Sequence, residues 1–190
     1  ASAGIASGPP LFVFQTTHIP GAWPNVSCAT GCSPLDAGSP IVVGAGALTL
    51  PSPVVLQRGR TLQVTTRAAG SLTAVAGTAV TAQGSSGSGR CTTDASGVCT
   101  MRGIAPGTYY VVADARGQNY IQTANGGAQC GLTFCSQLGT PVTVSAGGPD
   151  PAITIDMATG ARISGTITDG LTGRPATRSR ARIELFTPTG

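Results

Sequence analysis

The sequence predicts an all-β protein in which short strands, joined by tight turns, pack as β-sandwiches. The 190 residues include 28 glycines and 14 prolines, and only 9% are charged and 4% aromatic. This composition favours turns and short strands over helices. Turn residues recur at short intervals, and apolar residues alternate with polar ones between them, which is typical of strands with one buried face.

The rest of the chain is organised around the stretch 92–114. Its first turn spans 94–97, where the Asp94 side chain can bond the backbone ahead of it and Gly97 can adopt a positive φ. A short strand at 98–102 follows this turn.

A second turn follows at Pro106 and Gly107, before a strand at 109–114 that is rich in β-branched and aromatic residues. Proline fixes φ in such a turn, and glycine accepts the left-handed position. We therefore expect Gly107 at a positive φ, so that Gly107→Val costs more than about 1 kcal/mol and Ser86→Val costs little.

This stretch resembles the T-D-x-x-G-x-[YF]…L-x-P-G-x-Y-x-V signature of carboxypeptidase-regulatory-like repeats, relatives of the Cna-B-type domains of bacterial surface proteins. The sequence departs from it around Val98 and Cys99, where the family usually has an aromatic residue. The resemblance implies a seven-stranded, prealbumin-like or Ig-like sandwich in a secreted protein. The matching residues are Thr93, Asp94, Gly97, Ile104, Pro106, Gly107, Tyr109 and Val111.

The chain also contains an internal repeat. Gly-Ile-Ala-x-Gly occurs at residue 4 and at residue 103, an offset of 99 (103 − 4), and residues 38–46 match 139–147 at an offset of 101 (139 − 38). Because further matches occur in the same order, we expect tandem repeats with a period near 101 residues. These further matches pair Cys28 and Cys32 with Cys130 and Cys135, and Gly59 with Gly160.

The repeat and the family's first-strand pattern, which 161–169 fits best, set the expected domains. Residues 1–58 are the C-terminal part of a preceding sandwich, 59–158 a complete sandwich, and 159–190 the N-terminal part of a following one. The glycine- and serine-rich segment 84–89 is expected to be a mobile loop. The seven strands expected in the complete sandwich are 62–67, 79–83, 98–102, 109–114, 120–123, 141–145 and 152–157.

Six cysteines in a chain rich in small polar residues indicate an oxidising compartment. Two pairs occupy equivalent repeat positions and are expected to close within their own domains, which leaves the third pair to close across the turn at 94–97. A zinc site using His18 is the alternative, but there is no Cys-x2-Cys pair and the second repeat has no matching histidine. The expected disulfides are Cys28–Cys32, Cys91–Cys99 and Cys130–Cys135.

The residues do not indicate an enzyme, a metal or a cofactor. The one histidine, His18, has no Gly-x-Ser-x-Gly motif to serve, and the seven acidic residues are spaced too evenly to nominate a glycosidase pair. No D-x-D-x-D run suggests calcium. Lysine is absent, so the Lys–Asn or Lys–Asp cross-link common in Cna-B-type domains cannot form here.

Charge and hydropathy weigh against two classes of partner. The eleven arginines are scattered except at 174–182, which makes nucleic-acid binding a weak hypothesis. No apolar run approaches the roughly 18 residues of a membrane-spanning helix. Trp23 could stack on a sugar ring, although a cap over the sandwich edge is favoured, and Asn25 begins a glycosylation sequon.

Two function classes remain. The favoured one is a non-enzymatic structural repeat of an extracellular bacterial fibre, stalk or adhesin, which is expected to assemble head to tail with neighbouring copies because each half-unit could complete the next. The alternative is an accessory module of a secreted hydrolase that binds polysaccharide or protein. A binding module needs a localised aromatic or charged cluster, and the sequence offers few exposed aromatic residues to build one.

Overall fold

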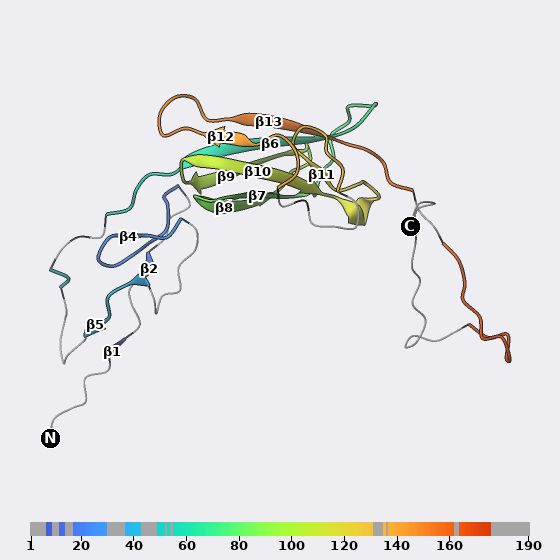
Figure 1. Cartoon of the computed structure of the whole chain (residues 1–190), viewed down its shortest axis with the longest axis horizontal. Coiled ribbons are helices and arrows are strands. Elements are labelled where there is room, and N and C mark those ends of the chain that lie inside the picture. The colour runs from blue at the N-terminus through green and yellow to red at the C-terminus, as the bar shows by residue number, and fades with distance from the viewer. Residues whose placement is uncertain are drawn as a thin grey trace, which may run out of the picture. The chain divides into compact units, whose positions relative to one another are not determined.

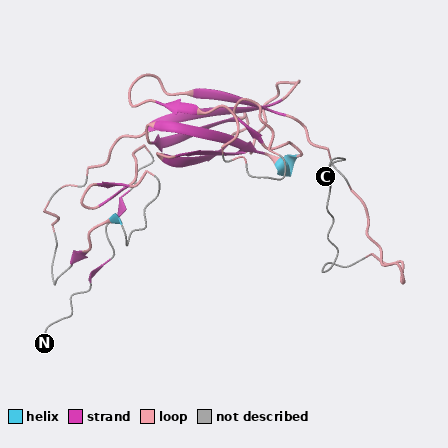
Figure 2. Cartoon of the chain, viewed as in Figure 1, coloured by secondary structure: helices cyan, strands magenta, loops and turns pink. Residues whose placement is uncertain are grey.

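The computed structural model describes residues 7–8, 12–13, 17–29, 37–42, 49–51, 53, 55–130, 135, 137–161 and 164–175. The chain divides into two compact units, Ala1–Gly160 and Ala161–Gly190. Apart from the short 3₁₀ turn η1 (Arg116–Gln118), the named elements are all strands, and strands make up the body of the fold (Figures 1 and 2). The predicted all-β class is confirmed.

One sheet of the sandwich contains β13 (Ala152–Met157), β6 (Arg60–Ala68) and β9 (Val98–Ile104), in that order. Strand β6 is antiparallel to β9 and parallel to β13. The first and last strands of the sandwich are therefore parallel neighbours (Figure 1).

The other sheet has β10 (Gly107–Asp114) at its centre. On one side β10 pairs with β7 (Ala79–Gly84), which pairs with the edge strand β8 (Gly87–Thr92). On the other side, two short strands pair with different parts of β10. These are β11 (Thr123–Ala124) and β12 (Val142–Val144).

The core between the sheets follows the alternation of the strands. Along β6, Leu62, Val64, Thr66 and Ala68 are buried, and Gln63 between them is exposed. The buried cluster includes Tyr109 and the inward residues of β7, β9, β10, β12 and β13. The largest of its fully buried side chains are Tyr109, Leu62, Ile155 and Met157.

The prediction of a mobile loop at 84–89 is wrong, and the described part of 59–158 contains eight named strands rather than the predicted seven. Gly84 pairs with Gly87 across a two-residue turn, and β8 follows directly. A Cβ on Gly89 would lie 2.5 Å from Ile104 Cδ1 and 2.9 Å from Met101 Sδ. Glycine in β8 thus lets the strand lie close to β9, a packing role that polar composition alone did not reveal.

The other predicted strands differ from the observed ones mainly at their ends. The largest shift is at 120–123, where the regular strand β11 begins only at Thr123. Tyr120 instead forms an isolated bridge with Thr159.

The N-terminal part of the first unit contains short paired strands. Five two-residue strands form a two-stranded and a three-stranded sheet. Backbone bonds from Gly59 N to Thr17 O (3.1 Å) and from Ile19 N to Gln57 O (2.9 Å) tie this part to the segment that enters β6. The strands are β1 (Ser7–Gly8) with β5 (Ile41–Val42), and β2 (Phe12–Val13) with β3 (Gly21–Ala22) and β4 (Val26–Ser27).

The described part of the second unit contains a turn at Asp169. The Asp169 carboxylate accepts hydrogen bonds from the backbone N–H groups of Leu171 (2.9 Å) and Thr172 (2.8 Å), and from the Thr172 hydroxyl. These bonds lower the pKa of Asp169, the backbone bond from Thr172 most of all. The aspartate acts here as a turn residue, consistent with its sequence context.

Candidate functional site

The turn between β8 and β9 is held by the Asp94 carboxylate. Its Oδ1 atom accepts hydrogen bonds from the Ser96 hydroxyl (2.6 Å), the Ser96 N–H (2.9 Å) and the Val98 N–H (3.0 Å). The Ser96 hydroxyl is the main reason that the pKa of Asp94 lies below its ordinary value, and the Val98 N–H adds to the effect. This bonding favours the ionised carboxylate.

Gly97 closes the same turn at a φ of 73°. A Cβ at this position would lie 2.5 Å from the Thr66 carbonyl oxygen, and the Thr66 N–H donates to the Gly97 carbonyl at 2.8 Å. Glycine is required here both by the backbone conformation and by its contact with β6.

Beneath this turn, three buried threonine hydroxyls converge on one carbonyl. Thr66, Thr93 and Thr78 donate to Val75 O at 2.8, 2.9 and 3.1 Å. The Thr93 hydroxyl also accepts from the Thr78 N–H at 2.9 Å. These bonds join β6, the segment leading into β7 and the end of β8 in a polar cluster inside the sandwich.

The roles of Thr66 and Thr78 in this cluster were not predicted from the sequence. A signal was present, because Thr66 continues the inward alternation of Leu62 and Val64. A threonine at an inward position needs hydrogen-bond partners in the core.

Tyr109 stabilises the turn between β9 and β10. Its side chain is fully buried, and its hydroxyl donates to the Ala105 carbonyl at 2.8 Å. Burial raises the pKa of Tyr109. Pro106 lies at the exposed bend between the two residues.

The prediction that Gly107 adopts a positive φ is wrong. The left-handed residue is Gly103, at a φ of 72°, and Gly107 is the first residue of β10, paired with Val144. A Cβ on Gly107 would lie 2.4 Å from Ser86 Oγ and 2.7 Å from Ser86 Cβ. Glycine is needed there for close packing against the β7–β8 turn, and Ser86→Val is no longer expected to be neutral.

Two disulfides lie between residues 91 and 135. Cys91 of β8 and Cys99 of β9 are bonded, with their Cα atoms 5.9 Å apart. Cys130 and Cys135 are bonded, with their Cα atoms 5.5 Å apart. Cys28 is also disulfide-bonded, and its predicted partner Cys32 lies outside the described residues.

The Cys91–Cys99 bond joins two different sheets. Strand β8 is the edge of one sheet and β9 is the edge of the other. The disulfide therefore closes one side of the sandwich covalently, and its two cysteines flank the Asp94 turn in the sequence.

Trp23 and His18 lie in the N-terminal part. Trp23 is half-buried with its indole Nε1 buried, and its carbonyl accepts from the Ser39 N–H at 2.9 Å. His18 Nδ1 lies 3.0 Å from the Thr17 hydroxyl. Within the described part of the chain, no group of three or more histidine, cysteine or acidic residues could hold a metal ion.

Each of the described aspartates is engaged in a turn or an ion pair. Asp94 and Asp169 hold turns, and the other three form ion pairs: Asp114 with Arg116 at 2.7 Å, Asp150 with Arg60 at 2.9 Å and Asp156 with Arg67 at 2.8 Å. The bond from Arg116 is the main cause that lowers the pKa of Asp114. Asp36 and Glu184 lie outside the described residues.

Among the described residues, no helix is long and apolar enough to cross a membrane.

Comparison with solved structures finds remote structural similarity. No protein-family model matches the chain, and no curated protein matches it. A solved structure of the pilus 2b backbone protein of group B streptococcus is similar at 16% identity and a TM-score of 0.35. The match covers 64% of this chain and 47% of that protein, so the chain spans about half of its length.

Proposed function

We propose that the chain is a non-enzymatic structural segment of an extracellular, surface-exposed bacterial fibre or stalk, and that its sandwich carries tension along the chain. The observation that supports this proposal is the parallel pairing of β6 with β13. Arg60 begins β6, and Met157, at the end of β13, pairs with Ala68 at the other end of β6. The chain thus enters and leaves the sandwich at opposite ends, which suits a linear array.

Tension applied at these two points loads the parallel pair in shear. Six residue pairs are in register, from Gln63 with Ala152 to Ala68 with Met157. Backbone bonds from Gln63 N to Pro151 O (3.0 Å) and from Ala69 N to Met157 O (2.8 Å) bracket this ladder. A force along the strands acts on all these bonds together, whereas a force across them would break them one at a time.

Covalent and polar links support the same role. The Cys91–Cys99 bond joins the sheet edges, and the threonine cluster around Val75 joins β6 to the opposite sheet. The chain contains no lysine, so disulfides take the place of an amine-derived cross-link. Disulfides persist in oxidising surroundings, which agrees with secretion.

Within this proposal, residues 59–158 are one complete repeat, and 1–58 and 159–190 belong to its two neighbours. The ends are completed either by further repeats of the same chain or by another copy. In the second case the residues after 160 pack against the equivalent of residues 1–58 in a neighbour, and assembly proceeds head to tail.

Light scattering and electron microscopy over a range of protein concentrations test the assembly. End-to-end strings whose length grows with concentration are the expected result. A monomer that remains unchanged over the whole range and folds both of its ends would contradict assembly between copies.

A further inference from the structure

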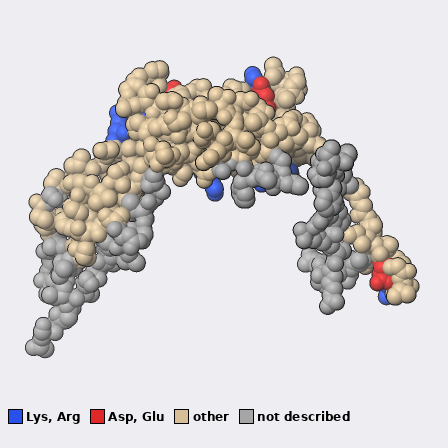
Figure 3. Space-filling view, viewed as in Figure 1, with Lys and Arg blue, Asp and Glu red and all other residues tan. Residues whose placement is uncertain are grey.

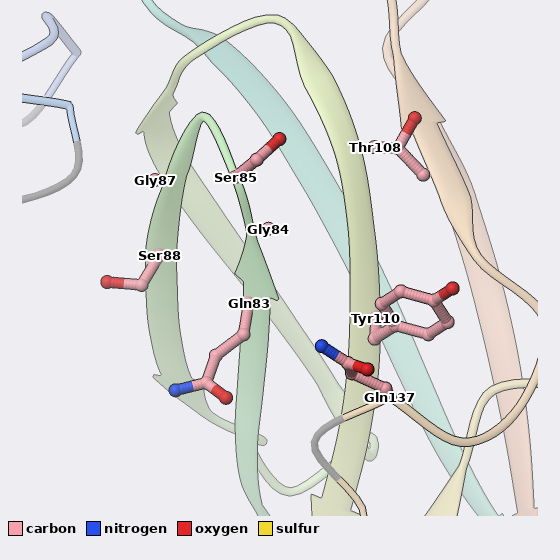
Figure 4. A pocket seen from close by; sticks show the side chains of 8 residues that line it. All are labelled: Gln83, Gly84, Ser85, Gly87, Ser88, Thr108, Tyr110 and Gln137. Carbon is pink, nitrogen blue, oxygen red and sulfur yellow. The ribbon is translucent and has the colours of Figure 1, made fainter.

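The outer face of the sheet formed by β8, β7 and β10 has a hollow, called the groove below, that has no part in carrying tension. Its volume is about 670 Å³, and Gln83, Ser88, Thr108, Tyr110 and Gln137 line it together with the β7–β8 turn. Figure 4 shows the Tyr110 ring beside Gln137, with Gln83 on the neighbouring strand.

Strand register aligns three of these side chains. Ser88 pairs with Gln83, and Gln83 pairs with Tyr110, so the three residues form one row across β8, β7 and β10. Adjacent strands lie about 4.8 Å apart, which makes the row about 10 Å wide. The half-buried Tyr110 ring thus lies at one end of a row whose other two members, Gln83 and Ser88, are polar and exposed.

Gln137 forms a wall of the hollow from outside the sheet. It lies two positions after Cys135, which is buried and bonded to Cys130. The Leu138 N–H donates to the Cys135 carbonyl at 3.3 Å. The disulfide and this backbone bond place the segment that carries Gln137 beside the sheet, where Gln137 lines the hollow.

The lining of the hollow is neutral. Its described lining residues include no arginine, aspartate or glutamate, although the chain has a net charge of +4. A second hollow of about 390 Å³ shares Gln83 and Tyr110 and continues along the strands, with Arg90, Asp114 and Arg116 on its border. Figure 3 shows how sparse charged side chains are on the face of the sandwich that it presents.

We propose that this groove binds a neutral glycan chain. The Tyr110 ring offers an apolar face for the C–H groups of a sugar ring, and the amides of Gln83 and Gln137 can each donate to and accept from neighbouring sugar hydroxyls. An anionic glycan would find no cation among the described residues that line the first hollow. This binding function goes beyond the structural role and does not depend on it, and its aromatic contact is Tyr110 rather than Trp23.

Affinity electrophoresis of the full chain tests the groove, with hydroxyethylcellulose, xyloglucan, galactomannan or soluble starch in the gel as neutral probes and polygalacturonate as the anionic probe. At least one neutral polysaccharide should retard the chain. Tyr110→Ala should weaken that retardation at least about tenfold, and Gln83→Ala should weaken it by about threefold to tenfold.

Gln63→Ala is the matched control, because Gln63 is an exposed glutamine on the outer face of the opposite sheet. It should bind as the unchanged chain does. Melting curves establish that each variant is folded, and the side-chain amide NMR signals of Gln83 and Gln137 should shift when the retarding polysaccharide's oligosaccharides are added.

Three results would overturn the proposal. They are no retardation by any neutral probe, retardation by polygalacturonate alone, or neutral binding that survives Tyr110→Ala and Gln83→Ala in folded protein. None of these results bears on the behaviour of the sandwich under tension, so the two proposals fail separately.

Discussion

Arg67 of β6 and Asp156 of β13 face each other across the parallel pair and form a two-pronged ion pair. Arg67 Nε lies 2.8 Å from Asp156 Oδ1, and the second contact, from Arg67 Nη2 to Asp156 Oδ2, is 3.1 Å. The two residues are direct partners in the strand register. The first and last strands of the sandwich are thus joined by side chains as well as by backbone.

The cysteines should all be oxidised in sequence-local pairs. Peptide mapping without reduction should recover Cys28–Cys32, Cys91–Cys99 and Cys130–Cys135, and free thiols or a bridge between different pairs would contradict this. Replacing Cys91 and Cys99 together by alanine should lower the free energy of unfolding by about 2.5 kcal/mol, because the unfolded chain gains loop entropy.

The double replacement of Cys130 and Cys135 by alanine is the control, because it also removes one disulfide but not the one that joins the two sheets. Hydrogen exchange should become faster in β8 and β9 when the Cys91–Cys99 bond is removed, since that bond joins the two sheet edges. The control variant should leave exchange in β8 and β9 unchanged.

Acid should weaken the Asp94 turn. The pKa of Asp94 is lowered in the folded state from the ordinary 3.8, so the unfolded chain binds a proton first as the pH falls. The stabilisation is therefore fully present above pH 3.8 and is lost as the pH falls through the lower folded value. NMR titration of the Asp94 carboxyl should show this depressed pKa, and Ser96→Ala should bring it back towards 3.8. An unchanged pKa in the Ser96→Ala variant would show that the hydroxyl is not the main cause.

Alanine substitutions at Gly97 and Gly127 distinguish the stability cost of backbone strain from the cost of a steric clash. Both have a positive φ, 73° and 84°, but a Cβ on Gly127 would meet nothing within 4 Å. Gly127→Ala should cost about 1–2 kcal/mol from its backbone conformation alone. Gly97→Ala should cost roughly 2–5 kcal/mol, because the new methyl group also meets the Thr66 carbonyl. Equal losses in urea unfolding would argue against the close approach of the turn to β6.

Thr93 should be more sensitive to substitution than its neighbour Thr92. Thr93→Val removes a donor to Val75 O and leaves the buried Thr78 N–H without its acceptor, a loss of about 1–3 kcal/mol. Thr92 is exposed on β8, and Thr92→Val should change stability by no more than about 0.5 kcal/mol. Similar unfolding free energies for the two variants would mean that the threonine cluster does not stabilise the core.

Sequence reasoning predicted the fold class because the signals were local. The alternation along 62–68 and 109–114 and the Asp94 turn chemistry depend on neighbouring residues alone. It missed β8 because Gly87, Ser88 and Gly89 have low strand propensity, and their strand depends on pairing with β7 and on contact with Ile104 and Met101.

The same limit applied to the candidate site. Gly107 was assigned to a turn because Pro-Gly is a strong local signal, but its constraint comes from Ser86, twenty-one positions earlier (107 − 86). The groove around Tyr110 could not be located without the register that aligns it with Gln83 and Ser88. Sites assembled from several strands are visible only once the pairing is known.

The proposal that the sandwich carries tension is tested most directly by pulling it along two directions with optical tweezers. The full chain is used, with site-specific handles that do not involve cysteine. Handles at residues 60 and 157 shear the parallel pair β6–β13. Handles at Arg60 and Ile104, which are partners in the antiparallel pair β6–β9, unzip neighbouring strands bond by bond. We predict a clearly higher unfolding force for 60 and 157 than for 60 and 104, and a reduction of the shear force alone by Arg67→Ala. Equal forces, or a lower force along 60 and 157, would contradict the proposal that this domain is built to carry tension along its chain.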